Sequence, residues 1–205
     1  MSHRLFPKLT LAVLFVAATV PSFSQVAPAA TVGGLPITVG VGLSDYDLDW
    51  GYGSRMVGIS AYVDWDLFIL PGPLRNLSIQ AEGNDISYGR PARLPIMRQD
   101  TGLGGLKYTY RHYPNLLPYV KYMGGIGSID FPNTSNRYYT HDTFGVWAPG
   151  AGVEYQIWRR LWVRGDYEYQ IWNKTFGPRD LTPQGFTIGG SYHFRSTYAH
   201  SSTEN

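Results

Sequence analysis

Eight segments of this sequence alternate between apolar and polar residues, and no other feature limits the possible folds as strongly. Because successive side chains of a β-strand point to opposite faces, each segment predicts a strand with one apolar and one polar face. After the first twenty-five residues, no segment shows convincing helical periodicity. We therefore predict an all-β, antiparallel fold from segments 37–46, 56–69, 77–88, 100–112, 118–130, 143–157, 161–173 and 185–194.

The lengths of these segments and of their connections favour a membrane barrel. The segments match or exceed the roughly nine to eleven residues with which a tilted strand crosses a bilayer. Short connections (LPGPLRN, YPNLL and the residues around Arg159 and Arg160) alternate with longer polar ones (DLDWGYGSR, GRPARLPIMRQ, PNTSNRYYTHD and KTFGPRDLTPQ). Outer-membrane proteins alternate short periplasmic turns with long surface loops in this way. The sequence thus predicts an eight-stranded up-and-down transmembrane β-barrel with both chain ends on the periplasmic side.

The two faces of the strands leave two kinds of barrel open. In segment 161–173, Leu161 and Val163 share a face opposite Arg164 and Asp166. A soluble, lipocalin-like barrel would turn the apolar face inward, whereas a membrane barrel turns it to lipid. The charged face carries six acidic and four basic residues, a near balance that favours ion pairs inside a narrow lumen. This predicted lumen network comprises Asp64, Asp66, Glu82, Lys107, Arg111, Lys121, Glu154, Arg164, Asp166 and Glu168.

The first residues have the layout of a secretory signal peptide. Arg4 and Lys8 precede the apolar run LTLAVLFVAATV, and small residues precede the predicted cleavage site at Gln25, with a later cut near Ala30 as an alternative. The run is short for the ~20 residues of a spanning helix, which makes a retained anchor the weaker interpretation. We predict a signal peptide at 1–24, an N-terminal segment at 25–36, an outer-membrane β-barrel at 37–194 and a disordered periplasmic tail at 195–205.

Composition limits the classes of function. Cysteine is absent, so neither disulfides nor thiolate metal sites can form. The net charge of +2 is spread along the chain, which disfavours nucleic-acid binding. Aromatic residues make up 15% of the chain, and some of those near strand ends are expected to form an interfacial girdle. The candidates for this girdle are Trp65, Tyr88, Tyr108, Tyr110, Tyr113, Tyr119, Trp158 and Trp162.

The strand count, the loop alternation, the ionic face and the last segment, GFTIGGSYHF, together carry a family resemblance. The chain resembles the small eight-stranded outer-membrane barrels of the OmpA and OmpX type, the outer membrane protein β-barrel domain family. The resemblance implies contact with outer-membrane lipid and lipopolysaccharide, and insertion by the barrel-assembly machinery, with Tyr192 and Phe194 as the assembly signal. The sequence departs from the family pattern by continuing as RSTYAHSSTEN after Phe194. We expect a monomer.

Candidate catalytic residues are few. Some barrels of this size modify lipid A, and Ser135 and His141 share the third long connection. The sequence does not bring them within the hydrogen-bond reach that a nucleophile and base need. His112 falls at the opposite end of the barrel and His193 on the lumen face, where non-catalytic roles are the simpler interpretation.

The acidic run SDYDLDWGYG begins like a calcium loop with Asp45, Asp47 and Asp49. An EF-hand would require Gly and Glu where Trp50 and Met56 stand. We interpret the run as a solvated acidic loop, with a loose cation site as the alternative, and we expect no cofactor.

The acidic pairs Asp64/Asp66 and Asp166/Glu168 could be read as acid–base pairs, but a lumen ion network explains them with fewer assumptions. Bulky side chains on the same face predict a filled lumen without an open pore: Tyr62, Phe68, Arg111, Arg164 and Trp172. We predict a non-enzymatic outer-membrane barrel with a structural, envelope-integrity or surface-adhesion role. The alternatives are a lipid A-modifying enzyme and a soluble ligand-binding barrel.

Overall fold

The computed structural model describes residues 35–49, 55–89, 98–132, 139–176 and 179–194. The predicted signal peptide at 1–24 and the predicted tail at 195–205 lie outside these ranges, as does most of segment 25–36. Among the described residues, no helix has both the length and the apolar character needed to cross a membrane.

The described chain is built from strands and one 3₁₀ helix, η1 (Gly72–Asn76). The strands are β1 (Ile37–Asp47), β2 (Arg55–Asp66), β3 (Leu77–Gly89), β4 (Arg98–Thr109), β5 (Leu116–Pro132), β6 (Tyr139–Gln156), β7 (Leu161–Tyr169), β8 (Ile171–Phe176), β9 (Arg179–Leu181) and β10 (Gln184–His193). Each of the eight predicted segments forms strand structure in its expected place.

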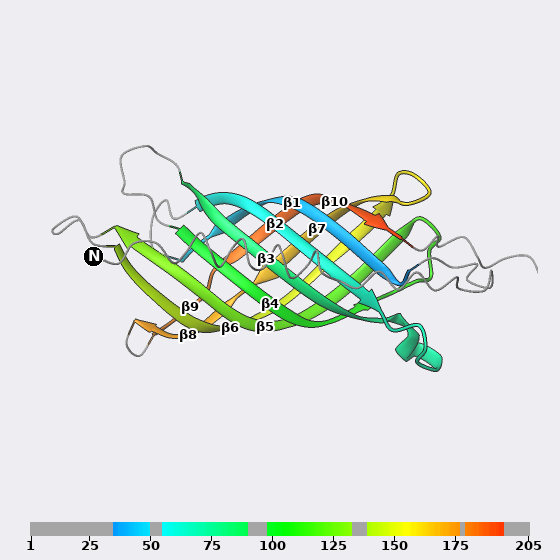
Figure 1. Cartoon of the computed structure of the whole chain (residues 1–205), viewed down its shortest axis with the longest axis horizontal. Helices are drawn as coiled ribbons and strands as arrows, with labels where there is room; N and C mark the ends of the chain where they lie inside the picture. Colours follow the sequence, from blue (N-terminus) through cyan, green and yellow to red (C-terminus); the bar gives the residue numbers. More distant parts are fainter. Residues whose placement is uncertain (1–34, 50–54, 90–97, 133–138, 177–178, 195–205) are drawn as a thin grey trace, which may run out of the picture. The chain divides into compact units, whose positions relative to one another are not determined.

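The strands form a closed antiparallel barrel in which β1 to β7 follow one another around the sheet and β10 lies between β7 and β1 (Figure 1). β1 pairs with β10 from Thr38↔His193 to Asp47↔Gln184, so the first and last strands join. β5 and β6 pair along their whole length, which completes the ring. Among the described residues, β1 to β7 and β10 are each paired on both sides, as a membrane-spanning sheet requires because lipid cannot satisfy backbone hydrogen bonds. The predicted eight-stranded up-and-down barrel is confirmed.

The seventh predicted segment is interrupted, which the sequence pattern did not indicate. β7 ends at Tyr169, and β8 continues after Gln170, whose backbone amide donates to the Pro183 carbonyl at 2.7 Å. Pro183 has no amide hydrogen to return, so the ladder between β7 and β10 is broken at this level. Beyond the break β8 and β9 pair as a short hairpin, so much of the connection predicted as the loop KTFGPRDLTPQ is strand.

Tight connections gather at one end of the barrel. Figure 1 shows η1, the β4–β5 turn and the yellow β6–β7 turn at the end opposite the β8–β9 hairpin. Strand β2 ends at Asp66 rather than at the predicted residue 69, and η1 follows Pro71. Gly72 has a φ of 58°, a left-handed conformation that glycine adopts without steric cost. β1 begins and β10 ends at this same end, because Ile37 lies opposite Trp65 and Thr38 opposite His193.

The core of the protein is the barrel interior. Along most strands, residues alternate between exposed apolar side chains on the outer wall and buried polar side chains inside. Two apolar clusters also lie inside, toward the end opposite the tight turns. The first contains Leu103, Met123, Ile129, Val146, Ala148, Trp172 and Leu181, and the second contains Tyr46, Leu48, Met56 and Ile86.

Candidate functional site in the barrel lumen

The predicted lumen residues fall into one buried group and one separate pair. Asp66 and Arg111 lie near the tight-turn end, partly exposed, with Arg111 Nη2 at 2.9 Å from Asp66 Oδ1. Strands β2 to β7 carry the buried group, which consists of Asp64, Glu82, Lys107, Lys121, Glu154, Arg164, Asp166 and Glu168. Each of these eight side chains is no more than 6% exposed.

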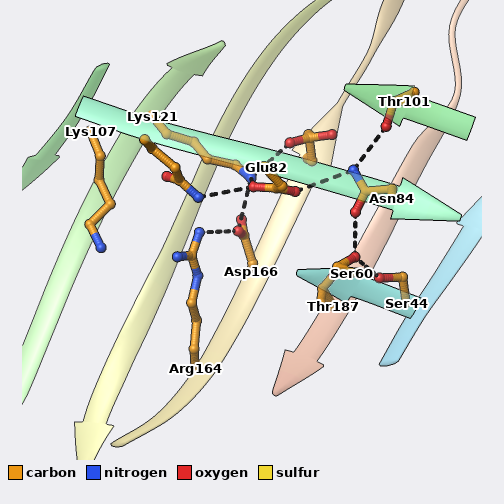
Figure 2. A network of polar contacts seen from close by, with 12 residues as sticks. Ser44, Ser60, Glu82, Asn84, Thr101, Lys107, Lys121, Arg164, Asp166 and Thr187 are labelled. Atoms are coloured by element: carbon orange, nitrogen blue, oxygen red, sulfur yellow. Dashed lines mark hydrogen bonds and ion pairs between the residues drawn. The ribbon is translucent and has the colours of Figure 1, made fainter. Parts of the chain in front are cut away.

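Lys121 is the centre of the buried group. Its Nζ lies 2.7 Å from Glu82 Oε2, 2.7 Å from Glu168 Oε2 and 2.9 Å from Asp166 Oδ2. Figure 2 shows Lys121 and Glu82 meeting above Asp166, to which Arg164 also points. One ammonium therefore links strands β3, β5 and β7 across the lumen.

Lys107 makes a second centre beside the first. Its Nζ lies 2.5 Å from Asp64 and 2.8 Å from Glu154. Lys107 stands directly opposite Lys121 in the β4–β5 register, a like-charge pairing that is unfavourable on an isolated ribbon. The two ammonium groups instead turn to different carboxylates, so each is surrounded by negative charge.

Arg164 joins the two centres. Its Nη2 lies 2.7 Å from Asp166, while its Nη1 lies 3.8 Å from Asp64 and 3.9 Å from Glu154. The guanidinium also stacks on the rings of Tyr62, at 3.9 Å, and Tyr119, at 4.6 Å. Tyr119 was expected in the outer girdle, but it is buried in the lumen because it shares the inward parity of Lys121.

A ladder of uncharged polar side chains extends the network around the barrel, and the sequence analysis did not identify it. Ser44 contacts Ser60, which donates to Asn84 Oδ1. Ser44 also contacts Thr187, and Asn84 donates to Thr101 at 3.0 Å (Figure 2). Part of the signal was present in the sequence, because Ser60, Asn84 and Thr101 alternate in phase with Asp64, Glu82 and Lys107 on their own strands.

His193 extends the charged network toward the tight-turn end. Its Nε2 lies 3.3 Å from Glu154 Oε2, and its ring stacks on that of Trp162 with centroids 4.9 Å apart. Trp162 was also a girdle candidate, but it is 1% exposed and lies inside the barrel. The buried group contains five carboxylates and three permanent cations, and His193 contacts one of these carboxylates.

The first apolar cluster fills the other half of the lumen. The Trp172 side chain is fully buried, and its Nε1 donates to Gln170 Oε1 at 2.8 Å. A Cβ atom at Gly127 would lie 2.2 Å from the Trp172 ring, so only glycine leaves room for this indole. Together with the ion network, Trp172 makes the described lumen a packed interior.

The outer wall has the chemistry of a lipid-facing surface. Its exposed side chains in mid-strand are aliphatic, such as Val41, Leu43, Ile59 and Ile188, while the charged residues Glu82, Lys107, Lys121 and Arg164 are buried inside the barrel. This arrangement is the reverse of a soluble barrel, so the lipocalin-like alternative is wrong. A family model described as the outer membrane protein beta-barrel domain matches residues 10–194. The chain belongs to this family.

Solved outer-membrane barrels share the fold. Neisserial surface protein A (NspA) has a TM-score of 0.56 at 10% sequence identity, covering 77% of this chain and 96% of that one. For Ail of Yersinia pestis the TM-score is 0.51 at 14% identity, with 77% and 96% covered. For OprG of Pseudomonas aeruginosa it is 0.52 at 12% identity, with 80% and 98% covered. No curated protein sequence matches the chain.

Family membership and fold place this outer-membrane barrel in the bacterial outer membrane. In proteins of this class the tight turns face the periplasm and the opposite end faces the cell surface. The surface end therefore carries the β8–β9 hairpin and the connections between β1 and β2, β3 and β4, and β5 and β6.

The three aspartates of the candidate calcium loop in this outer-membrane barrel do not converge on a common point. Asp45 pairs with Arg55 at 3.1 Å, and Asp49 accepts a hydrogen bond from Thr182 at 2.9 Å. Asp47 Oδ1 accepts from the Asp49 amide at 3.3 Å. Within the described ranges, no three His, Asp or Glu side chains are arranged to hold a metal ion.

The candidate catalytic residues fall largely outside the described part of the chain. Ser135 lies outside it, and His141 lies in β6 with a side chain that is not described. His112 is on the periplasmic β4–β5 turn, where its ring packs against Tyr110 and Tyr113.

The predicted assembly signal is at the periplasmic end of β10. The rings of Tyr192 and Phe194 meet edge to face with centroids 5.0 Å apart, and Phe194 is exposed. Phe186 and Ile188 of the same strand also face outward, whereas Ser191 and His193 are buried inside. The alternation predicted for GFTIGGSYHF is present, and its role in assembly stays a prediction.

Proposed function

We propose that this protein is a closed, non-enzymatic outer-membrane barrel that contributes to envelope integrity and presents its surface connections for contact with other surfaces. The observation that carries the proposal is the packing of the lumen. Lys121, Lys107 and Arg164 link carboxylates from four strands across the interior, and Trp172 packs above them. An aqueous channel generally requires about sixteen strands, whereas eight leave a lumen that side chains fill.

The absence of a pore is tested by conductance. Purified protein inserted in planar lipid bilayers should give no stable, reproducible channel, while a sixteen-stranded porin in the same bilayers serves as the positive control. A barrel with Arg164 and Trp172 both replaced by alanine should conduct more than wild type if it folds, because both substitutions enlarge the lumen. Stable single-channel steps from the wild-type protein would overturn the proposal of a closed barrel.

The surface role is tested in cells. A strain lacking the protein should become more sensitive to detergent and attach less well to surfaces. Complementation with a variant whose segments 90–97 and 133–138 are replaced by Gly/Ser turns should restore detergent resistance without restoring attachment. A deletion strain that differs from wild type in neither property would contradict both parts of the proposed role.

The proposed lack of catalysis is tested separately. Folded protein incubated with purified lipid A should leave its mass spectrum unchanged at several pH values. Loss or gain of an acyl chain would overturn the proposal, and Ser135→Ala and His141→Ala would then show whether that candidate pair is responsible.

A further inference from the structure

The β6–β7 turn combines exposed aromatic, aliphatic and cationic side chains at the periplasmic rim. Ile157 is 64% exposed and Trp158 is 70% exposed, and Arg159 and Arg160 follow. The backbone of the turn is well ordered by hydrogen bonds: the amides of Ile157 and Trp158 both donate to the Leu161 carbonyl at 3.0 Å. Gln156 Nε2 also donates to the Arg159 carbonyl at 3.2 Å. The turn thus presents its side chains on a fixed backbone.

Two shallow hollows flank this turn. One, of about 500 Å³, is lined by Trp158, Arg159, Arg160, Leu161 and Tyr192. The other, of about 420 Å³, is lined by Asn115, Gln156, Ile157, Trp158 and Arg159. The first hollow offers an apolar floor with both arginines at its edge, whereas the second places Ile157 and Trp158 beside Arg159 and polar side chains.

The guanidinium groups retain hydrogen-bonding capacity for a ligand. Arg160 Nη1 donates to the Tyr192 hydroxyl at 3.2 Å. The Arg159 guanidinium has no hydrogen bond or ion pair to any residue of the described ranges. A planar guanidinium has five N–H donors, which suit the oxygens of a phosphate group.

The charge of this rim is one-sided. At the periplasmic ends of the described strands the carboxylates are Asp64, Asp66 and Glu154, and all three turn into the barrel to meet Lys107 or Arg111. Arg159 and Arg160 therefore have no outward-facing carboxylate beside them in this part of the chain. Their charge complements an anion at the membrane surface.

We infer that the β6–β7 turn binds an anionic phospholipid of the inner leaflet, with the phosphate held by Arg159 and Arg160 and the glycerol and acyl region lying on Trp158 and Leu161. Tryptophan favours the membrane interface, and arginines near a bilayer surface attract anionic lipid. The outer leaflet is excluded as the source because the turn lies at the end opposite the β8–β9 hairpin, which is at the surface end in proteins of this class (Figure 1). This inference goes beyond the proposed function, because it requires neither surface contact nor a closed lumen.

The inference is tested with the full chain, refolded and checked by heat-modifiable migration. Native mass spectrometry after incubation with equal amounts of phosphatidylglycerol and phosphatidylcholine would show which lipid stays bound. Wild type should retain phosphatidylglycerol preferentially, and Arg159→Gln/Arg160→Gln should reduce that preference by about 30-fold, from the ~1 kcal/mol that each arginine contributes near an anionic surface. The preference should also fall as salt increases.

Matched variants decide the interpretation. Arg55→Gln removes an exposed arginine at the opposite end and should leave the preference unchanged. Arg159→Gln alone breaks no described contact, so it should fold and still lose part of the preference. Equal retention of both lipids by wild type, or an unaltered preference in the double variant, would overturn the inference. Stronger binding of lipopolysaccharide that also depends on Arg159 would overturn the assignment to an inner-leaflet lipid.

Discussion

Replacing Lys121 with methionine measures how far the buried ion network stabilises the barrel. The lysine side chain is 1% exposed and its ammonium lies within 2.9 Å of three carboxylates. Methionine fills similar space without the charge, so Glu82, Asp166 and Glu168 would remain buried with Arg164 as the nearest cation. Removing one partner of a buried ion pair costs about 3–5 kcal/mol. We expect the free energy of unfolding to fall by this amount, equivalent to at least a hundredfold in the equilibrium constant.

The assay is reversible urea unfolding in phospholipid vesicles, followed by tryptophan fluorescence. Arg55→Met is the control, because Arg55 and Asp45 form an ion pair with side chains 70% and 46% exposed. Exposed pairs contribute about 0–1 kcal/mol, so this substitution should change the free energy of unfolding only slightly. The comparison separates the effect of a buried network from a general effect of removing one positive charge.

A second substitution tests the cause of the loss. Glu82→Gln in the Lys121→Met background removes one of the carboxylates left without its cation, so it should recover part of the stability. In the wild-type background the same substitution should destabilise, which gives a coupling between the two sites. The reasoning is refuted if Lys121→Met costs no more than Arg55→Met, or if the two network substitutions add without coupling.

Three further predictions concern packing, the lipid-facing wall and assembly. Gly127→Val should cost about 1–3 kcal/mol by urea unfolding, because its side chain would enter the space of the Trp172 ring, and Trp172→Ala should relieve part of that cost. Val41→Arg, in the middle of β1 on the outer wall, should cost about 2–4 kcal/mol, whereas Ile69→Arg at the rim should cost at most about 1 kcal/mol. A similar loss from both would contradict the assignment of Val41 to the hydrocarbon region. Phe194→Ala should lower the fraction of heat-modifiable, folded protein recovered from outer membranes without abolishing in vitro refolding, and unchanged recovery would argue against its assembly role.

The positions of the strands were readable from the sequence because a period of two needs only local information. The same period assigned Lys107, Lys121 and Glu154 to the inner face, where the structure has them. The same period also indicated that Tyr119 and Trp162 face inward, because they alternate in phase with Lys121 and Arg164 on their own strands. Interpreting these two aromatics as girdle residues gave weight to their place near strand ends instead of to their phase.

Other features depended on geometry that the sequence pattern does not contain. The break at Gln170 follows from Pro183, which lies opposite Gln170 in the register that pairs β7 with β10 and is thirteen positions further along the chain. The polar ladder from Thr187 through Ser44 and Ser60 crosses β10, β1 and β2, and only closure of the barrel brings β10 beside β1. The need for glycine at position 127 became evident only with the Trp172 ring in place.

By itself, the sequence determined the number of strands, their order in an up-and-down barrel and the side chains that face inward, because each follows from alternation along a continuous chain. Only the tertiary structure decided which charges meet. Lys107 and Lys121 are adjacent across β4 and β5, yet one binds Asp64 and Glu154 and the other binds Glu82, Asp166 and Glu168. The physical reason is that partners across a lumen are set by the register and tilt of strands distant in sequence, and these are fixed only when the barrel closes.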